Sequence, residues 1–425
     1  MGKLLIQNGR IMDPVRQIET VSDLLIEDGK IASIGSVFDL TDVEQIIDAS
    51  GMIAAPGLAD VHVHFRDPGL TYKEDIHTGA AAAARGGFTT VVTMANTKPP
   101  VDSVETVQYV LAEGKKTGIR VLPAACISAG MKGKELVDME ALAEAGAVGF
   151  TDDGIPLCDE KLVIEAMKRA KALNMPLSFH EEDPAFILSP GVNQGRISAL
   201  LGIGGAPASA EYVLTSRDCA LALATGARIS IQHISAKESV SIVELFQQLG
   251  AEVYAEATPH HFTLTEDAVL AHGTLAKMNP PLRTDADRTA IIKGLQTDTI
   301  SIIATDHAPH STEEKEREFT KAPSGIIGLE TSLALGITTL VRPGHMSLME
   351  LLKKMSYNPL QFYHLDGGTL KEGERADLVL FCPDEKWVPD SYCSKASNSP
   401  FTGMTLYGKV KYTICQGNVV YCDQK

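Results

Sequence analysis

The sequence predicts an α/β protein: a (β/α)8 TIM-type barrel with a small β-sandwich domain formed from both chain termini. In the middle of the chain, short apolar runs alternate with helical patterns, whereas at both ends short apolar segments flank glycine turns. Polar residues also gather where the central apolar runs end, as expected at one rim of a barrel. The chain has 425 residues, which is enough for both parts.

Eight short apolar runs in the central region are predicted to be parallel strands. They begin near Asp60, Thr89, Arg120, Ala147, Pro176, Arg228, Glu252 and Ser301. Helical patterns between them cover residues 75–85, 161–173, 208–224 and 239–249. A closed barrel is favoured because an open sheet needs protected edges, and no such protection is evident. A doubly wound open sheet is the alternative, although no Gly-x-Gly-x-x-Gly follows the first strand.

Both chain ends carry a pattern of strand, glycine turn and strand. Apolar segments flank Asn8-Gly9 and Asp28-Gly29 near the start of the chain, and Gln416-Gly417-Asn418 near its end. Residues 376–381 are a further strand candidate. Neither end has the helical spacing of a βαβ unit, so both are predicted to build one small β domain. Its expected bounds are 1–54 plus 366–425, with the barrel at 55–365.

The composition excludes several classes of function. A formal charge of -16, from 38 basic and 54 acidic residues, argues against nucleic-acid binding, which requires a basic face. No apolar run reaches 18 residues and no signal peptide is evident, so no membrane association is expected. The seven cysteines form no Cys-x-x-Cys pair. Thiols without a disulfide pattern indicate a reducing compartment, and a cytoplasmic location is expected.

Residue types that bind metals lie at the carboxyl ends of five apolar runs. These residues are His62, His64, Asp153, His180, His233 and Asp306. The carboxyl ends of parallel barrel strands meet at one rim, and residues two apart on a strand, such as His62 and His64, share a face. Imidazole with carboxylate favours Zn²⁺ over Mg²⁺ or Ca²⁺. Because these ligands exceed the shell of one zinc, two ions sharing a carboxylate are predicted.

The pattern leaves three assignments open. Asp152 and Asp153 point to opposite sides of a strand, so one is the ligand and the other caps a helix or binds backbone amides. Arg66 lies either at the rim beside the metals or in a surface salt bridge. Residues 311–323 form either a solvated loop or a lid that closes over the site.

Asp306 and three histidines have possible roles beyond metal binding near the rim. Asp306 can bind a metal and also accept a proton from activated water. His310 lies on the loop beyond that strand and is better placed for substrate than for metal. His260 and His261 follow the seventh run on opposite faces and are interpreted as ordinary structural residues; if they have a function, it is to support the metal ligands from behind.

Two long motifs and three shorter ones resemble a known group of enzymes. The long motifs are Asp-Val-His-Val-His-Phe-Arg-Asp-Pro-Gly at 60–69 and Ala-Thr-Asp-His-Ala-Pro-His at 304–310, continuing to Lys315. The shorter ones are Met-Ala-Asn-Thr at 94–97, Phe-Thr-Asp-Asp-Gly at 150–154 and Met-Asn-Pro-Pro-Leu-Arg at 278–283. Together they resemble the amidohydrolase superfamily and, within it, the dihydroorotases. The resemblance spans the whole chain.

The resemblance implies a distribution of the metal ligands. His62, His64 and Asp306 would hold one zinc, His180 and His233 the second, and Asp153 would bridge them. Many relatives bridge instead with a carboxylated lysine from the fourth strand. No lysine lies within 147–154, so this sequence resembles the branch that uses aspartate. One or two Zn²⁺ ions per subunit, with two expected, are the implied cofactors.

The implied reaction is the reversible cyclisation of N-carbamoyl-L-aspartate to (S)-dihydroorotate plus water, in de novo pyrimidine (UMP) biosynthesis. A metal-activated water would attack the ring amide, and Asp306 would carry the proton to the leaving nitrogen. Arg66 would pair with the substrate carboxylate. The implied substrate contacts are His64, Arg66, Asn96, Asn279, His310, Ser324 and Gly325.

Two other functions compete with this one. Another cyclic amidase, a hydantoinase or allantoinase, is disfavoured by Arg66 and by the absent lysine of the fourth strand. A scaffold that supports aspartate transcarbamoylase without catalysis would be expected to lack metal ligands, whereas all six are present here. Catalysis and partnership can coexist, so aspartate transcarbamoylase remains an expected partner beside the small-molecule substrate. A homo-oligomer is also expected.

Overall fold

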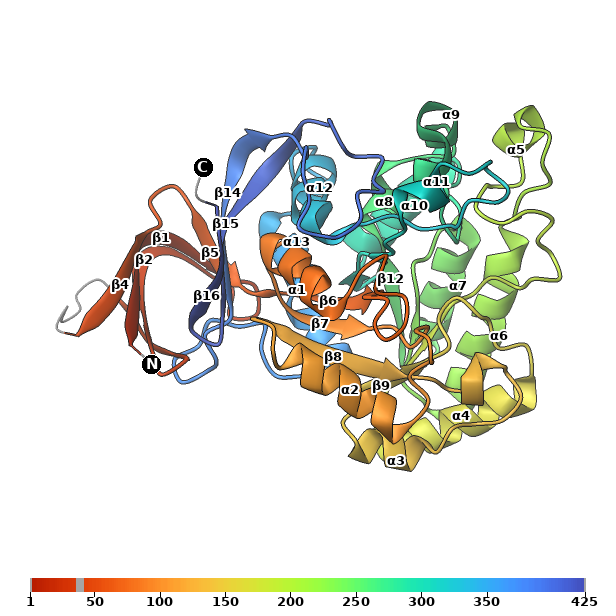
Figure 1. Cartoon of the computed structure of the whole chain (residues 1–425), viewed down its shortest axis with the longest axis horizontal. Helices are drawn as coiled ribbons and strands as arrows, with labels where there is room; N and C mark the ends of the chain where they lie inside the picture. Colours follow the sequence, from red (N-terminus) through yellow and green to blue (C-terminus); the bar gives the residue numbers. More distant parts are fainter. Residues whose placement is uncertain (1, 36–41, 424–425) are drawn as a thin grey trace.

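The chain forms two separate eight-stranded sheets, one from its middle and one from both of its ends. The structure, a computed structural model, describes residues 2–35 and 42–423. The sheet built from the two ends lies at one side of the molecule, and the helix-covered barrel lies at the other (Figure 1). This arrangement confirms the predicted fold class.

The central sheet is a barrel of parallel strands that follow one another in sequence order. Its strands are β6 (Leu58–Val63), β7 (Phe88–Thr93), β8 (Arg120–Ala125), β9 (Gly149–Thr151), β10 (Leu177–Phe179), β11 (Ile229–Ile231), β12 (Val253–Ala257) and β13 (Ile302–Ile303). All eight coincide with predicted runs. A bridge between Val63 and His307 joins the first strand to the segment after the last one. There the His64 amide donates to the His307 carbonyl at 2.8 Å, which closes the barrel.

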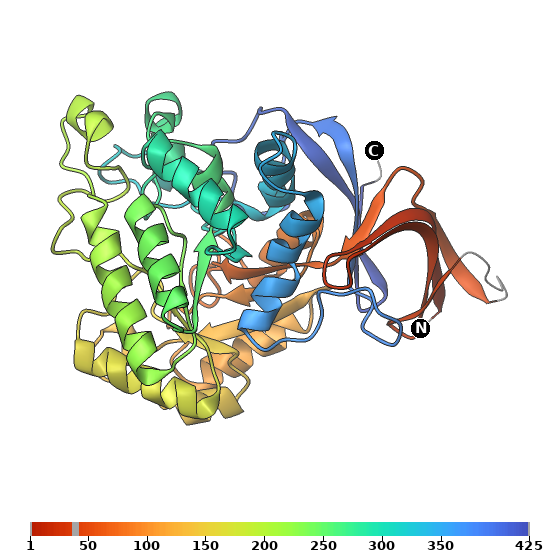
Figure 2. The same ribbon diagram turned by 180° about the vertical axis from the view of Figure 1, so that it is seen from behind.

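Helices cover the outside of the barrel, as the view from behind shows (Figure 2). The longer ones are α1 (Ile76–Arg85), α2 (Val104–Gly114), α4 (Glu160–Leu173), α6 (Ser209–Thr225), α7 (Lys237–Gln248), α10 (Asp285–Gln296) and α13 (Leu348–Met355). The shorter ones are α3 (Met139–Glu144), α5 (Arg196–Leu200), α8 (Pro259–Thr263), α9 (Ala268–His272), α11 (Thr312–Lys315), α12 (Ser332–Gly336) and α14 (Tyr357–Phe362). Within residues 2–35 and 42–423, none has the length and apolar character needed to cross a bilayer.

Local sequence explains where the helices begin and end. Asp75 caps α1 with its carboxylate on the Thr78 amide, and Thr78 caps back, which satisfies amides that a helix start leaves free. Asn174 ends α4 in the left-handed conformation, φ 54°, that this residue type tolerates. The four helical patterns predicted from the sequence correspond to α1, α4, α6 and α7 within a few residues.

The second sheet unites the two ends of the chain. Its strands are β1 (Lys3–Asp13), β2 (Ile18–Glu27), β3 (Lys30–Gly35), β4 (Val43–Asp48), β5 (Ile53–Pro56), β14 (Leu378–Trp387), β15 (Leu406–Cys415) and β16 (Asn418–Cys422). β5 pairs with β1 on one side and with β14 on the other, so it joins the two halves. Residues such as Leu4, Ile31, Leu378 and Ile414 bury a core that belongs to this sheet. The division at 54 and 366 stays a prediction, and β5 extends across position 54.

Two of the three predicted glycine turns at the chain ends are hairpins, and one is not. Asp28-Gly29 joins β2 to β3, and Gln416-Gly417 joins β15 to β16, with φ positive at all four residues. The turn predicted at Asn8-Gly9 is wrong, because β1 continues through it. Asn8, φ 60°, instead introduces a register shift in the pairing of β1 with β2. Bulges and hairpin turns both favour asparagine and glycine, because both need residues with positive φ. The Asn-Gly pair alone therefore does not distinguish a bulge from a hairpin.

A buried carboxylate at Asp60 links the first strand of the barrel to the chain beyond the last. It accepts hydrogen bonds from the His62 amide at 3.0 Å and from the Thr305 amide at 3.1 Å. The first amide belongs to the rim residue His62, and the second directly precedes the rim residue Asp306. Asp60 therefore fixes the backbone of β6 and of the segment after β13 relative to each other.

Replacing this carboxylate should destabilise the fold. Asp60→Ala leaves two buried amides without acceptors and should lower the free energy of unfolding by about 2–4 kcal/mol. Denaturant unfolding followed by circular dichroism measures the change. Asp384→Ala, which removes an exposed carboxylate paired with Arg342, is the control and should change stability little. Equal stability of Asp60→Ala and wild type would contradict the role given to Asp60.

Candidate metal centre

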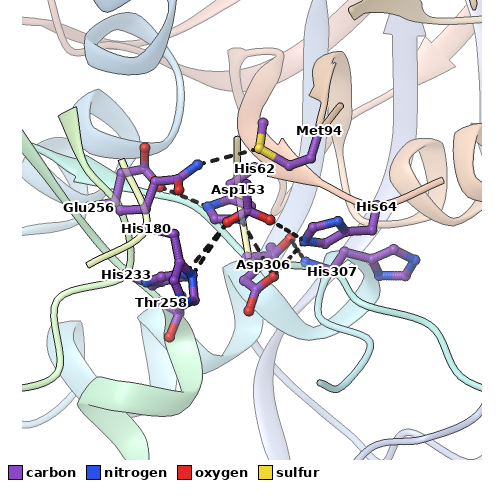
Figure 3. A network of polar contacts seen from close by, with 12 residues as sticks. His62, His64, Met94, Asp153, His180, His233, Glu256, Thr258, Asp306 and His307 are labelled. Carbon is purple, nitrogen blue, oxygen red and sulfur yellow. Dashed lines mark hydrogen bonds and ion pairs between the residues drawn. The ribbon is translucent and has the colours of Figure 1, made fainter. Parts of the chain in front are cut away.

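Four histidines and two aspartates meet at the carboxyl ends of the barrel strands. His62 is on β6 and His64 follows it, while Asp153, His180, His233 and Asp306 follow β9, β10, β11 and β13. Their side chains point toward one another in Figure 3. Two groups could each hold an ion, namely His62, His64 and Asp153, and Asp153, His180 and His233. The sequence-predicted ligands are therefore brought together, and Asp153 belongs to both groups.

Asp153 is the centre of this cluster, because its carboxylate contacts all four imidazoles. Oδ1 lies 3.3 Å from His62 Nε2, 3.6 Å from His180 Nδ1 and 3.8 Å from His233 Nε2. Oδ2 lies 3.3 Å from His64 Nε2. The neighbouring Asp152 instead accepts hydrogen bonds from the amides of residues 127 and 128. Of the two aspartates left open by the sequence, Asp153 is thus the one placed among the histidines.

Asp306 lies beside the first group. Its Oδ1 is 3.0 Å from His64 Nε2 and 3.6 Å from His62 Nε2. Its backbone is in the left-handed region, φ 48°, as is that of His233, φ 31°. This conformation strains the backbone of residues other than glycine, and strained residues of this kind are found most often at functional sites. His233 lies two residues beyond the end of β11, and Asp306 lies three residues beyond the end of β13.

The residues present fit a metal ion. His62 Nε2 and Asp153 Oδ1 are both buried and have no hydrogen-bond partner in the described part of the chain. Buried polar atoms without partners cost free energy unless something satisfies them. A cation between these two atoms would do so, and nitrogen with carboxylate oxygen is a donor set that zinc accepts.

The electrostatics of the cluster also favour positive charge. Burial alone would lower the pKa of His62, but the Asp153 carboxylate and a hydrogen bond to Glu256 hold it well above its usual value. The pKa of His180 rises to about 10 against the effect of burial, because Asp153 and Glu182 lie beside it. Burial and the neighbouring imidazoles hold the pKa of His233 well below its usual value. The carboxylates thus make this point of the protein attractive to cations.

A cavity of about 190 Å³ opens next to the cluster. It is lined by His64, Arg66, Asn96, Asp153, Gly154, His180, His233, Asn279, Asp306, Ala308, His310, Ser324 and Gly325. All seven predicted substrate contacts line it, together with five of the six predicted ligands. Larger cavities exist elsewhere, but none of those described has this histidine and aspartate cluster in its wall.

Arg66 supplies positive charge to this cavity. It is not in a surface salt bridge, since its Nε donates to the Pro309 carbonyl at 3.3 Å and its charge faces Asp306 and Asp153. Burial lowers the pKa of the guanidinium, but an arginine stays charged at neutral pH. Arg66 itself is in the left-handed region, φ 60°. Of the two positions that the sequence left open for Arg66, the structure has the one at the rim.

His310 faces the cavity as a neutral imidazole. Burial and the cations Arg66, Lys73 and Lys315 lower its pKa to about 2. Its Nε2 donates to the Ser324 carbonyl at 2.8 Å, which leaves Nδ1 as an acceptor, and Lys73 Nζ lies 3.3 Å from that atom. The wall that carries residues 324 and 325 is thus hydrogen-bonded to His310.

The segment 311–323 combines exposed and buried residues. Most of it is exposed, as expected of a solvated loop, but Lys315 is buried. Lys315 Nζ donates to the carbonyls of residues 323 and 325 at 2.9 and 3.0 Å. Lys277 Nζ donates to the carbonyls of residues 319 and 322 at 2.6 and 2.7 Å. Lys315 therefore ties the start of the segment to its end, and Lys277 ties the end of the segment to the chain that follows η2 (Gly273–Ala276).

Comparison with known proteins places this geometry in a family. Residues 51–239 match a family model described as dihydro-orotase-like. The dihydroorotase of Clostridioides difficile strain 630 is 60% identical over 418 residues, which cover 98% of this chain and 99% of that protein. The dihydroorotase of Streptococcus pneumoniae serotype 4 is 53% identical over 420 residues, with the same coverage. The chain belongs to the dihydroorotase family.

Solved structures agree with the family assignment. An L-hydantoinase (dihydropyrimidinase) from Arthrobacter aurescens superimposes with a TM-score of 0.86 at 27% identity and covers 100% of this chain and 97% of its own. A D-hydantoinase with a TM-score of 0.87 and 23% identity shows the same fold. This member of the dihydroorotase family is accordingly a cyclic amide hydrolase built on a barrel with a terminal β domain.

Three residues of this dihydroorotase-family site hold the imidazoles in one orientation. Glu256 Oε2 is 3.1 Å from His62 Nδ1, Asn96 Oδ1 is 2.8 Å from His64 Nδ1, and Glu182 Oε2 is 3.0 Å from His180 Nε2. Each contact takes the ring N–H and so directs the other nitrogen toward Asp153 as an acceptor.

Two of these three residues were not predicted from the sequence. Glu256 interrupts the apolar run of β12, and an acidic residue within such a run is the signal from which a role at the site could be predicted. Glu182 lies two residues beyond His180, where strand alternation would place it on the same face. The predicted support by His260 and His261 takes another form, because His261 Nε2 contacts the Pro280 carbonyl at 3.0 Å instead of a ligand.

Glu256 offers a test of this support. Glu256→Gln presents an amide N–H to His62 Nδ1, which favours the tautomer whose Nε2 is protonated and unable to bind a metal. Zinc affinity should fall about 10–100-fold. Competition with a chelator, read out as bound zinc, measures it. Glu252→Gln, which alters the half-exposed partner of Arg228 just before the same strand, is the control and should leave zinc affinity unchanged.

Proposed function

We propose that this chain catalyses the reversible cyclisation of N-carbamoyl-L-aspartate to dihydroorotate, with zinc at the cluster of histidines and aspartates. The family assignment gives the reaction, and one observation supports this site for it. The carboxylate of Asp153 lies among four imidazoles at the strand ends, directly beside a cavity that contains Arg66. An anionic substrate of small size suits a cavity of about 190 Å³ with an arginine in its wall.

Two zinc ions are the proposed cofactors. His62, His64 and Asp306 would hold one, His180 and His233 the other, and Asp153 would contact both. When bound, the ions would polarise the amide carbonyl and lower the pKa of water. The support for two ions is that Asp153 belongs to both ligand groups.

Asp306 is proposed as the proton carrier. It lies within contact of His64 and lines the cavity, so one carboxylate serves both the cluster and the substrate space. In the direction of hydrolysis, its carboxylate would take the proton of the attacking water and give it to the departing ring nitrogen. In cyclisation the same carboxylate would move the proton in the opposite direction.

The substrate carboxylate is proposed to bind at Arg66, with Asn96 and His310 alongside it. The support is that all three line one cavity and that Arg66 has no carboxylate partner of its own within hydrogen-bonding distance in the described structure. Asn279 and residues 324–325 would hold the ring. Asn279 Oδ1 is buried and has no hydrogen-bond partner among residues 2–35 and 42–423, which suits an acceptor for a ring N–H.

The first experiment is an assay of the purified protein with its zinc content measured. We expect interconversion of dihydroorotate and carbamoyl aspartate that a chelator abolishes and zinc restores. Hydantoin, a neutral ring, serves as the comparison substrate and should react poorly because it lacks the carboxylate. Rapid turnover of hydantoin with weak turnover of dihydroorotate would overturn the proposal in favour of another cyclic amidase.

Removing the proton carrier should remove turnover. Asp306→Asn keeps the shape of the side chain but cannot accept the proton, so kcat should fall about 10²–10⁴-fold, with some loss of metal as well. Initial rates with zinc in excess measure it. A kcat near that of wild type would show that Asp306 carries no proton.

Removing the guanidinium should weaken substrate binding selectively. Arg66→Met keeps the length of the side chain but loses the charge-assisted hydrogen bonds, so KM should rise about 10–100-fold. Bound zinc should stay at the wild-type level, because Arg66 is not among the proposed ligands. An unchanged KM at wild-type zinc content would mean that the carboxylate binds elsewhere.

Further properties stay predictions. We propose a cytoplasmic location, which is compatible with seven free cysteines. We also propose a homo-oligomer and an association with aspartate transcarbamoylase. Sedimentation of the pure protein, alone and with the transcarbamoylase, distinguishes these assemblies from a monomer.

A further inference from the structure

We infer that Asn398, on the connection between β14 and β15, is a positioning residue for the substrate side of the cavity. This inference rests on the proposed substrate contacts of His310 and Gly325. The connection, residues 388–405, starts and ends in the terminal sheet, yet it extends over the barrel (Figure 1). Its residue 398 is buried beside the cavity wall, far along the sequence from every predicted site residue.

Asn398 joins the two stretches of chain that line the cavity opposite the metal cluster. Its Nδ2 donates to the Ala308 carbonyl at 3.1 Å and to the Gly325 carbonyl at 3.0 Å. Its Oδ1 accepts from the His310 amide at 3.2 Å. Every hydrogen-bonding group of this amide is therefore used, and each partner residue lines the cavity.

The two stretches that Asn398 joins are in close contact. A methyl group placed at Gly325, φ 124°, would lie 2.7 Å from the Ala308 side chain, so the two backbones can approach only because residue 325 is glycine. Across this contact His310 Nε2 donates to the Ser324 carbonyl. The position of the His310 imidazole thus depends on a spacing that the Asn398 side chain sets from behind.

Asn398 itself is held by contacts outside the cavity. Residues 394 and 395 bond the buried carboxylate of Glu74, the latter through its amide at 3.1 Å. The Cys393 amide donates to Glu330 at 2.9 Å. The Asn398 carbonyl accepts from the Ile327 amide at 3.1 Å. The backbone of the segment is therefore fixed independently of the side chain that is to be tested.

The test replaces the amide while keeping its shape. Asn398→Asp retains Oδ1 but replaces two N–H donors with a carboxylate oxygen that faces two carbonyls. We expect KM for dihydroorotate to rise about tenfold or more, from the loss of two hydrogen bonds, while kcat changes less than about threefold. Bound zinc should equal that of wild type, because no proposed ligand contacts Asn398. Asn398→Ala provides the same comparison without the added charge, should the aspartate variant not fold.

The matched control is the next residue. Ser399 is also buried, and its Oγ accepts from the Phe401 amide at 3.2 Å, away from residues 308–310 and 325. Ser399→Ala should lower the melting temperature without raising KM. A similar rise of KM in Ser399→Ala and in the Asn398 variants would overturn the inference, since packing of the segment alone would then explain it.

Arg66→Met, measured in parallel, distinguishes a failure of the role given to Asn398 from a failure of the proposed substrate placement. A raised KM in Arg66→Met with an unchanged KM in both Asn398 variants would overturn the role of Asn398 alone. An unchanged KM in Arg66→Met would instead overturn the proposed substrate placement, and the inference with it. Raised KM in Arg66→Met and in the Asn398 variants, with Ser399→Ala unaffected, supports both.

Discussion

The architecture of the site depends on one buried carboxylate, that of Asp153, which lies within contact of four imidazoles. A group with this many polar neighbours can be buried only if each neighbour presents a nitrogen lone pair or a proton in a defined direction. The orientations of His62, His64 and His180 are therefore constrained from behind, by Glu256, Asn96 and Glu182 respectively. His233 is instead in contact with His180, whose Nδ1 lies 3.0 Å from its Nε2. These supports in turn require strands that end at the same level, which the closed parallel barrel provides.

The opposite side of the cavity has the opposite electrostatic character. The protein as a whole carries a formal charge of -16, yet burial together with the nearby Arg66, Lys73 and Lys315 lowers the pKa of His310 so far that its imidazole is neutral. Local charge and net charge thus differ in sign. The proposed substrate carboxylate would meet Arg66 on one wall and the cluster that attracts metal ions on the other, so electrostatics as well as shape would orient the substrate in the cavity.

The sequence was most informative where chemistry and periodicity coincide. Eight apolar runs predicted the barrel because its interior must be apolar, and polar residues such as His180 and His233 stood out because they end those runs. Periodicity could not choose between Asp152 and Asp153, since the backbone turns just after β9. Asn8-Gly9 was misassigned because the same residues serve a hairpin and a bulge. Asn398 carried no signal, because its contacts join residues more than seventy positions apart and follow only from the tertiary fold.

The pairing of β5 with both β1 and β14 has a consequence for the order in which the protein is assembled. During synthesis β1 to β5 leave the ribosome long before β14 to β16 are made. The edge of β5 that pairs with β14 therefore stays without hydrogen-bond partners until the end of the chain is synthesised. The barrel strands pair in sequence order and need no such delay. Contacts between distant parts of a chain form slowly, since a large loop must close first. The terminal sheet is therefore expected to be the last part of the nascent chain to become native.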